Sequence, residues 1–285
     1  MTVTSDNFIT GSIVMIHSFL KFNSTFKGKI IILHNQLSIE NQNILKNFPN
    51  IIFHSISKNL KLAVDILTSK SPNLKHKKNR FYSLELFNLN TNSNILFCDS
   101  DILFNSNISE IFEEKEKVLV CAEYIQYLGY SRDKTTFDVV FNQNDKNNLN
   151  KTFNAGLIYL PKHFVSQIYF KKTLEYLDYK FWQNIKEPYT DQIVFNKLLE
   201  NHTNFLPITY NCLLNRRKEL NNFIPKNIKK IKVLHFNGAK PWSFKNYFFK
   251  IQKDIVLLKF FKLWQENYTE AFQYLSIKEQ TKDKI

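Results

Sequence analysis

The chain has 285 residues, a hydrophobic share of 44% and a formal net charge of +14. This size fits one large domain, or one domain with a small appendage, and its three cysteines form neither a zinc pattern nor a disulfide framework. The positive charge leaves three classes of partner open: nucleic acid, an anionic membrane, or a phosphorylated small molecule.

The sequence predicts neither a signal peptide nor a transmembrane helix. A strand-like segment begins almost directly after Met1, and no apolar run approaches the roughly 20 residues needed to span a bilayer. We therefore expect a cytoplasmic protein that is at most peripheral to a membrane. The densest basic patch, at residues 75–80, is short and resembles no nucleic-acid-binding module, so nucleic acid is the least favoured partner.

The first hundred residues alternate between strand and helix patterns. Strands are predicted at 1–4, 29–34, 50–54 and 94–98, and helices at 8–22, 38–48, 60–68 and 80–90, with Ser38 as a helix cap. This alternation predicts an α/β fold with a mixed, mostly parallel sheet flanked by helices.

The rest of the chain is less regular. Strands are predicted at 118–122, 156–160 and 231–235, helices at 164–179 and 191–200, and a long polar loop at 131–151. The segment 245–275, rich in Phe, Tyr, Trp and Lys, predicts one or two helices packed on the body; the alternative is a membrane-surface element. We expect a catalytic domain at 1–242 and a C-terminal aromatic and basic helical extension at 243–285.

Three side chains at predicted strand ends indicate a metal site. Asp99 and Asp101 directly follow the strand at 94–98, and ligands of open α/β sheets bind beyond the carboxyl ends of strands. Residues i and i+2 of an extended chain point to one side, so the two carboxylates offer hard oxygen ligands to a divalent cation. His235 ends another strand, and an imidazole shifts the preference from Mg²⁺ toward Mn²⁺. Each feature alone is also common in proteins without a metal.

Other polar positions indicate a sugar-phosphate ligand. Asn154, beside Ala155 and Gly156, suits hydrogen bonding to sugar hydroxyls, and Lys240 offers a compact charge for a phosphate. Asp191 and Gln192 begin a predicted helix after Thr190, a candidate cap; the alternative role of Asp191 is to complement the helix dipole. The chain has no GxGxxG motif and no P-loop, which argues against those nucleotide sites.

The ordered set of motifs resembles the family 8 glycosyltransferases. These motifs are Asp99-x-Asp101, Asn154-Ala155-Gly156, Asp191-Gln192 and His235-x-x-Gly238-x-Lys240-Pro241-Trp242, preceded by Thr2-Val3-Thr4-Ser5-Asp6-Asn7-Phe8 and Gly11. The resemblance covers about residues 1–242. It implies a GT-A fold, Mn²⁺ or else Mg²⁺, a UDP-hexose donor, and transfer with retention of anomeric configuration.

The resemblance also implies roles by position. The residues implied to bind the donor are Thr2, Thr4, Ser5, Phe8, Arg80, Asp99, Ser100, Asp101, Asn154, Ala155, Asp191, Gln192, His235, Gly238 and Lys240. Within this set Asp99, Asp101 and His235 would hold the metal, while Gly238 and Lys240 would face the diphosphate. Asp191, with Gln192 beside it, would lie nearest the reacting carbon and is the catalytic candidate.

The chain departs from the family pattern at three places. One residue is missing between Gly238 and Lys240, and Ser83 occupies a position where the family carries a basic residue, which Arg80 would replace. The position of glycogenin's self-glucosylated tyrosine falls near Lys218, so glycogen priming by that route is not expected. These departures leave open a weakly active or inactive glycan-binding or UDP-binding relative, and the net charge leaves open a nucleic-acid-binding protein.

Several properties are not readable from one sequence. The donor sugar can be glucose, galactose or N-acetylglucosamine, and the acceptor can be a glycan, a glycolipid or a protein. Acceptor contacts are expected from the loops at 124–151 and 213–230, which no sequence rule interprets. The linkage and the oligomeric state are equally open.

Overall fold

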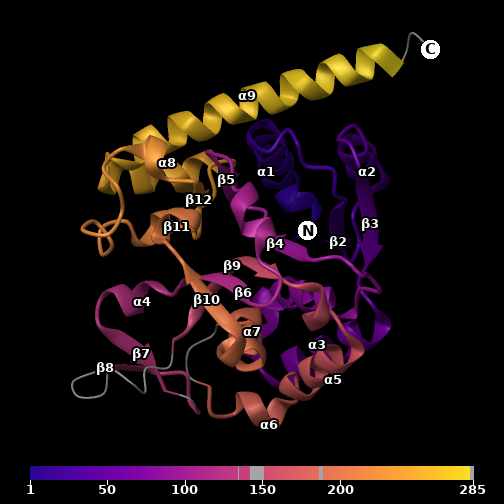
Figure 1. Ribbon diagram of the computed structural model, residues 1–285, viewed down its shortest axis with the longest axis vertical. Coiled ribbons are helices and arrows are strands. Elements are labelled where there is room, and N and C mark those ends of the chain that lie inside the picture. The colour runs from indigo at the N-terminus through magenta and orange to yellow at the C-terminus, as the bar shows by residue number, and fades with distance from the viewer. Residues whose placement is uncertain (134, 142–150, 186–188, 283–285) are drawn as a thin grey trace. The chain divides into compact units, whose positions relative to one another are not determined.

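The computed structural model describes residues 1–133, 135–141, 151–185 and 189–282 (Figure 1). The chain divides into two compact units, which are described separately. The first unit comprises Met1, 55–98 and 110–208, and the second comprises 2–54, 99–109 and 209–285. The expected domain boundary at residue 242 stays a prediction.

A mixed four-stranded sheet forms the centre of the first unit. Its strand order is β10 (Thr203–Leu206), β6 (Val118–Ala122), β9 (Phe153–Leu160) and β4 (Ile95–Cys98). β10 and β6 are parallel, whereas β9 runs antiparallel to both β6 and β4. β9 is buried along most of its length, as expected for a central strand covered on both faces. It begins at Phe153, earlier than predicted, and therefore includes Asn154, Ala155 and Gly156.

Helices and short segments surround this sheet. The α-helices are α3 (Lys58–Lys70), α4 (Tyr124–Tyr127), α5 (Gln167–Tyr176), α6 (Tyr179–Trp182) and α7 (Asp191–Leu199). Short 3-10 turns lie at Ser109–Glu113, Lys162–Phe164 and Glu200–His202. The helix predicted at 80–90 is instead part of a 3-10 segment, Pro72–Asn88, in which Pro72 occupies the first turn. The helix predicted at 164–179 is divided because the Asp178 side chain accepts a hydrogen bond from the Lys180 amide and caps a new helix.

The loop predicted at 131–151 is wrong at residues 131–132 and 139–141. These residues belong to β7 (Tyr130–Arg132) and β8 (Val139–Phe141), which pair as an antiparallel hairpin. The fully buried Arg132 anchors this hairpin, because its guanidinium pairs with the carboxylate of the equally buried Glu123. Residues 134 and 142–150 of the predicted loop lie outside the described residues.

Two three-stranded sheets belong mainly to the second unit. One has the order β1 (Thr2–Val3), β2 (Ile30–His34), β3 (Ile51–Ser55), with β1 and β2 parallel. The other has the order β11 (Cys212–Leu213), β12 (Val233–His235), β5 (Ile102–Phe104). β5 and β11 were not predicted, since two or three residues are too short for a clear pattern.

The helices of the second unit include α1 (Ile9–Phe22) and α2 (Ile39–Leu45). Ser38 caps α2 as predicted, accepting a hydrogen bond from the Asn41 amide. Short 3-10 turns lie at Asp6–Phe8, Ile208–Tyr210, Leu214–Arg216 and Ile228–Lys230. None of the described helices is long and apolar enough to cross a membrane.

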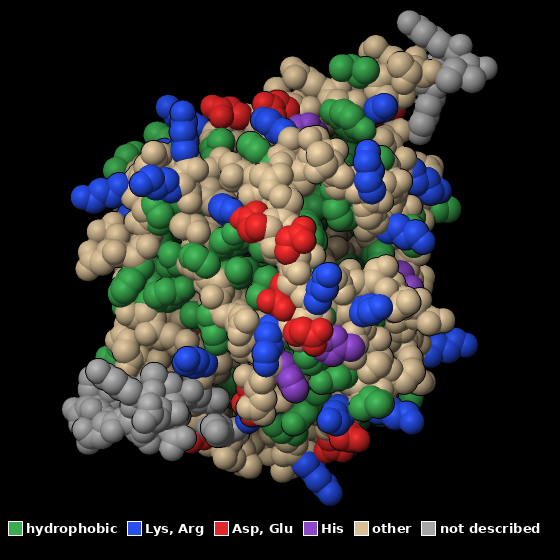
Figure 2. All heavy atoms as spheres, in the orientation of Figure 1, with side chains coloured by type: hydrophobic (Ala, Val, Ile, Leu, Met, Phe, Trp, Pro, Cys, Tyr) green, Lys and Arg blue, Asp and Glu red, His purple; other side chains and the backbone are tan. Residues whose placement is uncertain are grey.

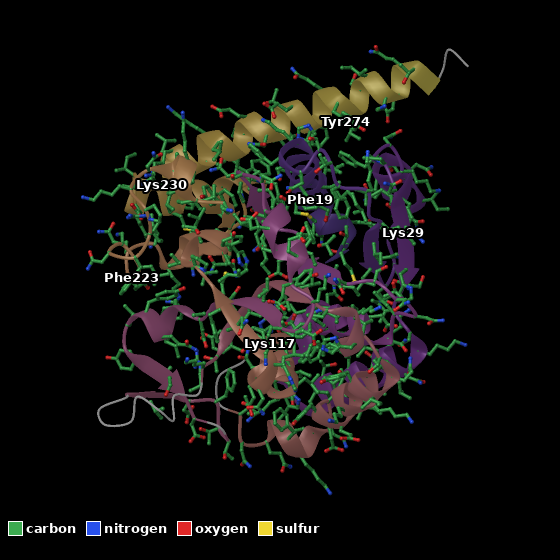
Figure 3. The ribbon with its side chains drawn as sticks, in the orientation of Figure 1. Phe19, Lys29, Lys117, Phe223, Lys230 and Tyr274 are labelled. Carbon is green, nitrogen blue, oxygen red and sulfur yellow. The ribbon has the colours of Figure 1, made fainter. Side chains whose placement is uncertain are left out.

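The C-terminal segment forms two helices, as the sequence predicts. These are α8 (Phe244–Lys253) and α9 (Leu257–Lys282), and α9 runs along α1 (Figure 1). Phe260 and Trp264 of α9 are buried in a hydrophobic cluster of this unit. Farther along α9, Tyr274 lies on the side that faces the body of the unit, where its ring stacks on Phe48 (Figure 3).

Candidate functional site

The turn between β4 and β5 carries Asp99, Ser100 and Asp101. β5 pairs antiparallel with β12, and this register sets His235 opposite Ile102, the residue directly after Asp101. The Phe236 amide also donates to the Asp101 carbonyl oxygen at 2.9 Å. Strand pairing thus brings together residues more than a hundred positions apart. One ligand atom from each of Asp99, Asp101 and His235 lies within 4.8 Å of the others.

Asn211 orients the His235 ring. It precedes β11, whose parallel pairing with β12 sets Leu213 beside His235. The Asn211 Oδ1 atom lies 2.8 Å from Nδ1 of His235, and an amide oxygen can only accept a hydrogen bond. Nδ1 therefore carries a proton, and in the neutral ring the lone pair of Nε2 faces the two aspartates. The sequence reasoning missed Asn211, because no local pattern singles it out.

The donor set fits a divalent cation. His235 Nε2 lies 3.2 Å from Oδ1 of Asp101 and 3.6 Å from Oδ2 of Asp99. In the tautomer that Asn211 favours, Nε2 and the carboxylate are both acceptors, so their approach is not a hydrogen bond. Oδ1 of Asp101 is buried and has no hydrogen-bond partner among the described residues, an arrangement that costs free energy unless a cation binds this oxygen. Two carboxylates and one imidazole suit Mn²⁺ or Mg²⁺.

Lys240 lies at the same cluster. Its ammonium donates to Oδ2 of Asp101, and at 3.2 Å to the Phe236 carbonyl oxygen. Burial acts to raise the pKa of Asp101, but the ammonium of Lys240 and the neighbouring His235 outweigh it and hold that pKa well below its usual range. Asp101 therefore stays ionised, as a metal ligand must.

The N-terminal motif packs against the C-terminal motif. The ring of Phe8 meets Trp242 edge-on at 5.6 Å. A Cβ added at Gly11 would lie 2.5 Å from both the Ser100 carbonyl oxygen and the Trp242 ring, so only glycine fits between them. The motifs that begin and end the resemblance are thus neighbours in the second unit.

The other N-terminal residues implied to contact uridine differ in their bonding. The Thr4 hydroxyl is buried and pairs with the Ser12 hydroxyl at 2.7 Å. The Thr2 hydroxyl is buried and has no partner among the described residues. Ser5 precedes the short 3-10 turn Asp6–Phe8 without capping it. Whether these residues bind uridine stays a prediction.

A second polar cluster lies within the first unit, at the start of α7. The Gln192 Oε1 atom accepts from the Asn154 amide group at 3.1 Å and from the Ala155 backbone at 3.3 Å. Gln192 Nε2 is buried without a partner in the described chain. β9 bulges here: Val120 opposes Ile158, but Cys121 opposes Asn154. Bulges of this kind re-aim side chains and are frequent beside active sites.

Asn196, which the sequence reasoning missed, holds this bulge in place. Its side chain accepts from the Phe153 amide at 2.8 Å and donates to the Phe153 carbonyl oxygen at 2.9 Å. It also donates to the Gln192 carbonyl oxygen at 2.7 Å. Asn196 therefore links the start of β9 to α7 and positions Asn154 beside Gln192.

Asp191 is held by two hydroxyls. Ser83 donates to its Oδ2 at 2.7 Å, and Thr190 donates to its Oδ1 at 2.8 Å. Thr190 occupies the N-cap position of α7, as expected, but its side chain makes no capping hydrogen bond. Burial raises the pKa of Asp191, and the two hydroxyls and the charge of the exposed Arg80 oppose that rise only in part.

The comparisons with known proteins agree on a family. Residues 1–246 match the family model described as glycosyl transferase family 8. The lipopolysaccharide 1,2-glucosyltransferase of Escherichia coli (strain K12) is 29% identical over 170 residues, covering 57% of this chain and 48% of that protein. The chain thus spans about half the length of this curated relative.

Solved structures show the same fold. The galactosyltransferase LgtC, in complex with donor and acceptor sugar analogues, superposes with a TM-score of 0.65 at 16% identity, covering 94% of each chain. The glycosyltransferase GlyE of Streptococcus pneumoniae TIGR4 gives a TM-score of 0.60 at 15% identity, covering 96% of this chain and 62% of its own. The predicted GT-A fold and the resemblance that carried it are confirmed.

Proposed function

The chain belongs to glycosyl transferase family 8, and on that premise we propose that it is a metal-dependent, retaining hexosyltransferase that uses a UDP-sugar. The observation that carries the proposal is the cluster of Asp99, Asp101 and His235, with a buried carboxylate oxygen that lacks a hydrogen-bond partner. A site of this kind suits a diphosphate donor, since a divalent cation held by these residues would offset the negative charge of the phosphate groups.

The proposed metal is Mn²⁺, with Mg²⁺ as the alternative. The imidazole of His235 favours Mn²⁺ over Mg²⁺, which prefers an all-oxygen set. When bound, the cation would neutralise charge that gathers on the departing UDP. Asn211 keeps the lone pair of His235 directed at the site, and Lys240 keeps Asp101 ionised.

The remaining residues receive roles from the family pattern. Thr2, Thr4, Ser5 and Phe8 are proposed to contact the uridine, Ser100 the donor, and Gly238 and Lys240 the diphosphate. In the first unit, Asn154, Ala155, Asp191 and Gln192 are proposed to bind the transferred sugar, with Arg80 assisting. Nε2 of Gln192 has no partner in the part of the chain that the structure describes, which supports this role, because a sugar hydroxyl can accept a hydrogen bond from it.

The proposed transfer proceeds with retention. The bond between the anomeric carbon and the diphosphate oxygen breaks, and the acceptor oxygen bonds to that carbon on the face from which UDP leaves. The acceptor proton passes to the departing phosphate, so no dedicated protein base is required. Asp191 is proposed to lie nearest the reacting carbon, where its carboxylate would stabilise positive charge on the sugar ring.

The donor hexose is proposed to be glucose, galactose or N-acetylglucosamine, and the acceptor a glycan, a glycolipid or a protein. The name of the Escherichia coli relative makes a lipopolysaccharide acceptor the first to try. A panel of nucleotide sugars, scored by UDP release with and without Mn²⁺, tests the reaction class, the metal and the donor together. Release that requires Mn²⁺ and is restricted to UDP-sugars would support the proposal, and no release from any donor would contradict it.

Two alternative functions each predict a different result in binding and turnover measurements. A weakly active or inactive relative is favoured by Lys240 being paired with Asp101 and by Ser83 at the usual basic position. It would bind UDP with Mn²⁺ and turn over no donor. A nucleic-acid-binding protein would show steeply salt-dependent affinity for DNA. On the viewed face, Lys and Arg side chains are dispersed among carboxylates and apolar groups, which does not favour this alternative (Figure 2).

We also propose that α8 and the turn after it contact an anionic membrane surface. Three of their large apolar side chains are more than half exposed: Phe244 at 60%, Phe249 at 54% and Ile255 at 69%. Exposed lysines, Lys245 and Lys253, lie on the same helix, as in basic amphipathic surface helices. Cosedimentation with anionic but not neutral vesicles, reduced in Phe244→Ser/Phe249→Ser, is expected. Equal binding of both proteins to the vesicles would contradict this role.

A further inference from the structure

A lysine outside the family motifs reaches the loop that contains Gly238. Lys250 belongs to α8 and is half-buried. A Cβ added at Gly238 would lie 2.8 Å from the Lys250 Nζ atom and 3.2 Å from the Asn215 amide. Gly238 itself has a φ of +95°, a conformation that glycine adopts without strain. The ammonium of Lys250 thus lies directly against the backbone of this loop.

Asn215 holds Lys250 in this place. Its Oδ1 accepts a hydrogen bond from the Lys250 ammonium, and its backbone amide donates to the Asn237 side chain at 3.0 Å. Asn215 therefore joins the lysine to the loop residue that precedes Gly238. The partner of the ammonium in this bond is a neutral amide, which leaves the positive charge uncompensated there.

The neighbouring lysine is engaged differently. The ammonium of Lys240 donates to the Asp101 carboxylate. The loop has one residue fewer between Gly238 and Lys240 than the usual family motif, and Lys240 is held at the metal cluster. A diphosphate that contacts Gly238 would therefore find Lys240 already paired with a carboxylate, and Lys250 beside it.

The surroundings of Lys250 are those of an anion site. Burial lowers the pKa of Lys250, and repulsion from Lys240 and Arg216 lowers it further. Lys240 is paired with the carboxylate of Asp101, and Arg216 with that of Glu219. An anion beside Gly238 would therefore offset the charge of Lys250 and accept a charge-assisted hydrogen bond from it.

We propose that Lys250 of α8 is a second phosphate-binding cation for the donor diphosphate, positioned by Asn215 against Gly238. This inference rests on the proposed function, because it assigns a further residue to the same donor. It gives α8 a role in the donor site in addition to its exposed apolar face.

The test compares Lys250→Met with Lys253→Met, a control on the exposed side of the same helix. Affinities of UDP and uridine are measured calorimetrically with Mn²⁺ present. In Lys250→Met, the loss of one charge-assisted phosphate contact is expected to weaken UDP binding by about tenfold or more. The affinity of this variant for uridine should not change. Lys253→Met should bind both ligands as the parent does. Equal UDP affinity in Lys250→Met and the parent would overturn the inference, as would equal weakening of UDP and uridine.

A second measurement needs no variant. The parent protein is treated with an amine-acylating reagent, and the modification of each lysine is followed by mass spectrometry. UDP with Mn²⁺ is expected to protect Lys250 and not Lys253, and unprotected Lys250 would overturn the inference. If the parent binds no UDP at all, the proposed function itself fails. If the parent binds UDP but Lys250 is neither protected nor needed for binding, only the inference about Lys250 fails.

Discussion

The side-chain oxygen of Asn211 lies 2.8 Å from Nδ1 of His235 and decides which ring nitrogen is free. Because an amide oxygen only accepts, Nδ1 carries a proton, and the neutral ring presents the lone pair of Nε2 to Asp101. Partners of this kind orient metal-binding histidines and make them more basic. Asn211 is therefore a positioning residue of the proposed metal site.

Asn211→Ala should lower the affinity for Mn²⁺ without removing a ligand. We expect a loss of about 10–100-fold, the usual cost of removing the group that orients a metal-binding histidine. Titration of Mn²⁺ against the purified protein, with UDP present, measures it. Asn211→Asp keeps an acceptor at the same place and is the matched control. Unchanged Mn²⁺ affinity in Asn211→Ala would show that the hydrogen bond has no part in metal binding.

Gly238→Ala should destabilise the protein more than an equivalent change at Gly129. Both glycines have positive φ, +95° and +82°, so each alanine meets backbone strain of roughly 1–2 kcal/mol. Only at Gly238 would the new Cβ meet Lys250 and Asn215, whereas Gly129 has open space around it. Urea unfolding of both variants separates strain from contact. Equal losses of unfolding free energy in the two variants would mean that the side chains around Gly238 move aside for the new methyl group at little cost.

The raised pKa of Asp191 predicts a pH-dependent effect of Asp191→Asn. A carboxyl whose folded pKa is raised contributes stability that is present below its unfolded value, about 3.8, and is lost as pH rises through the folded value. Burial is the main cause of the shift. The Asp191→Asn variant has no carboxyl group at this position and so does not lose stability in this way. Its free energy of unfolding, relative to that of the parent, should therefore increase as pH rises from about 4 to 8. Urea midpoints at several pH values measure the difference, and a difference that is constant or falls with pH would contradict the raised pKa of Asp191.

Breaking the buried ion pair of Arg132 should be costly. The two side chains are 1% and 2% exposed, and Arg132 also lies over the Tyr189 ring at 4.5 Å. Arg132→Met leaves the Glu123 carboxylate buried without its partner, which costs about 3–5 kcal/mol of unfolding free energy. Lys78→Met removes the more exposed pair with Asp65 and should cost less than about 1 kcal/mol. Similar losses in the two variants would show that Arg132 and Glu123 are not a tight pair.

Some features of the site were predictable because they depend on short patterns. Asp99, Asp101 and His235 each follow or end an apolar run, and strand ends meet at a sheet edge. The α/β class followed from the alternation of strands and helices, and the GT-A fold was implied by the family resemblance of the ordered motifs. The cap at Ser38 was readable because it depends on residues within one turn of the helix.

Other features depend on contacts that no local pattern encodes. The hydrogen bond from Ser83 to Asp191 joins residues 108 positions apart, and Asn211 meets His235 only through the pairing of β11 and β12. The hairpin of β7 and β8 was missed because the segment 131–151 as a whole is polar and Asn-rich, although β8 itself is apolar. A buried Arg132, paired with Glu123, stabilises it where an apolar core would be expected. In each case tertiary context outweighs composition.

The metal-dependent transfer is tested most directly by Asp101→Asn, which keeps the shape of the side chain and removes its charge. Release of UDP from the best donor of the panel is measured against Mn²⁺ concentration in the parent and the variant. Loss of a carboxylate ligand should abolish the Mn²⁺ dependence and lower turnover by about 100-fold or more. Full Mn²⁺-dependent turnover in Asp101→Asn would contradict the proposed metal site and the mechanism built on it.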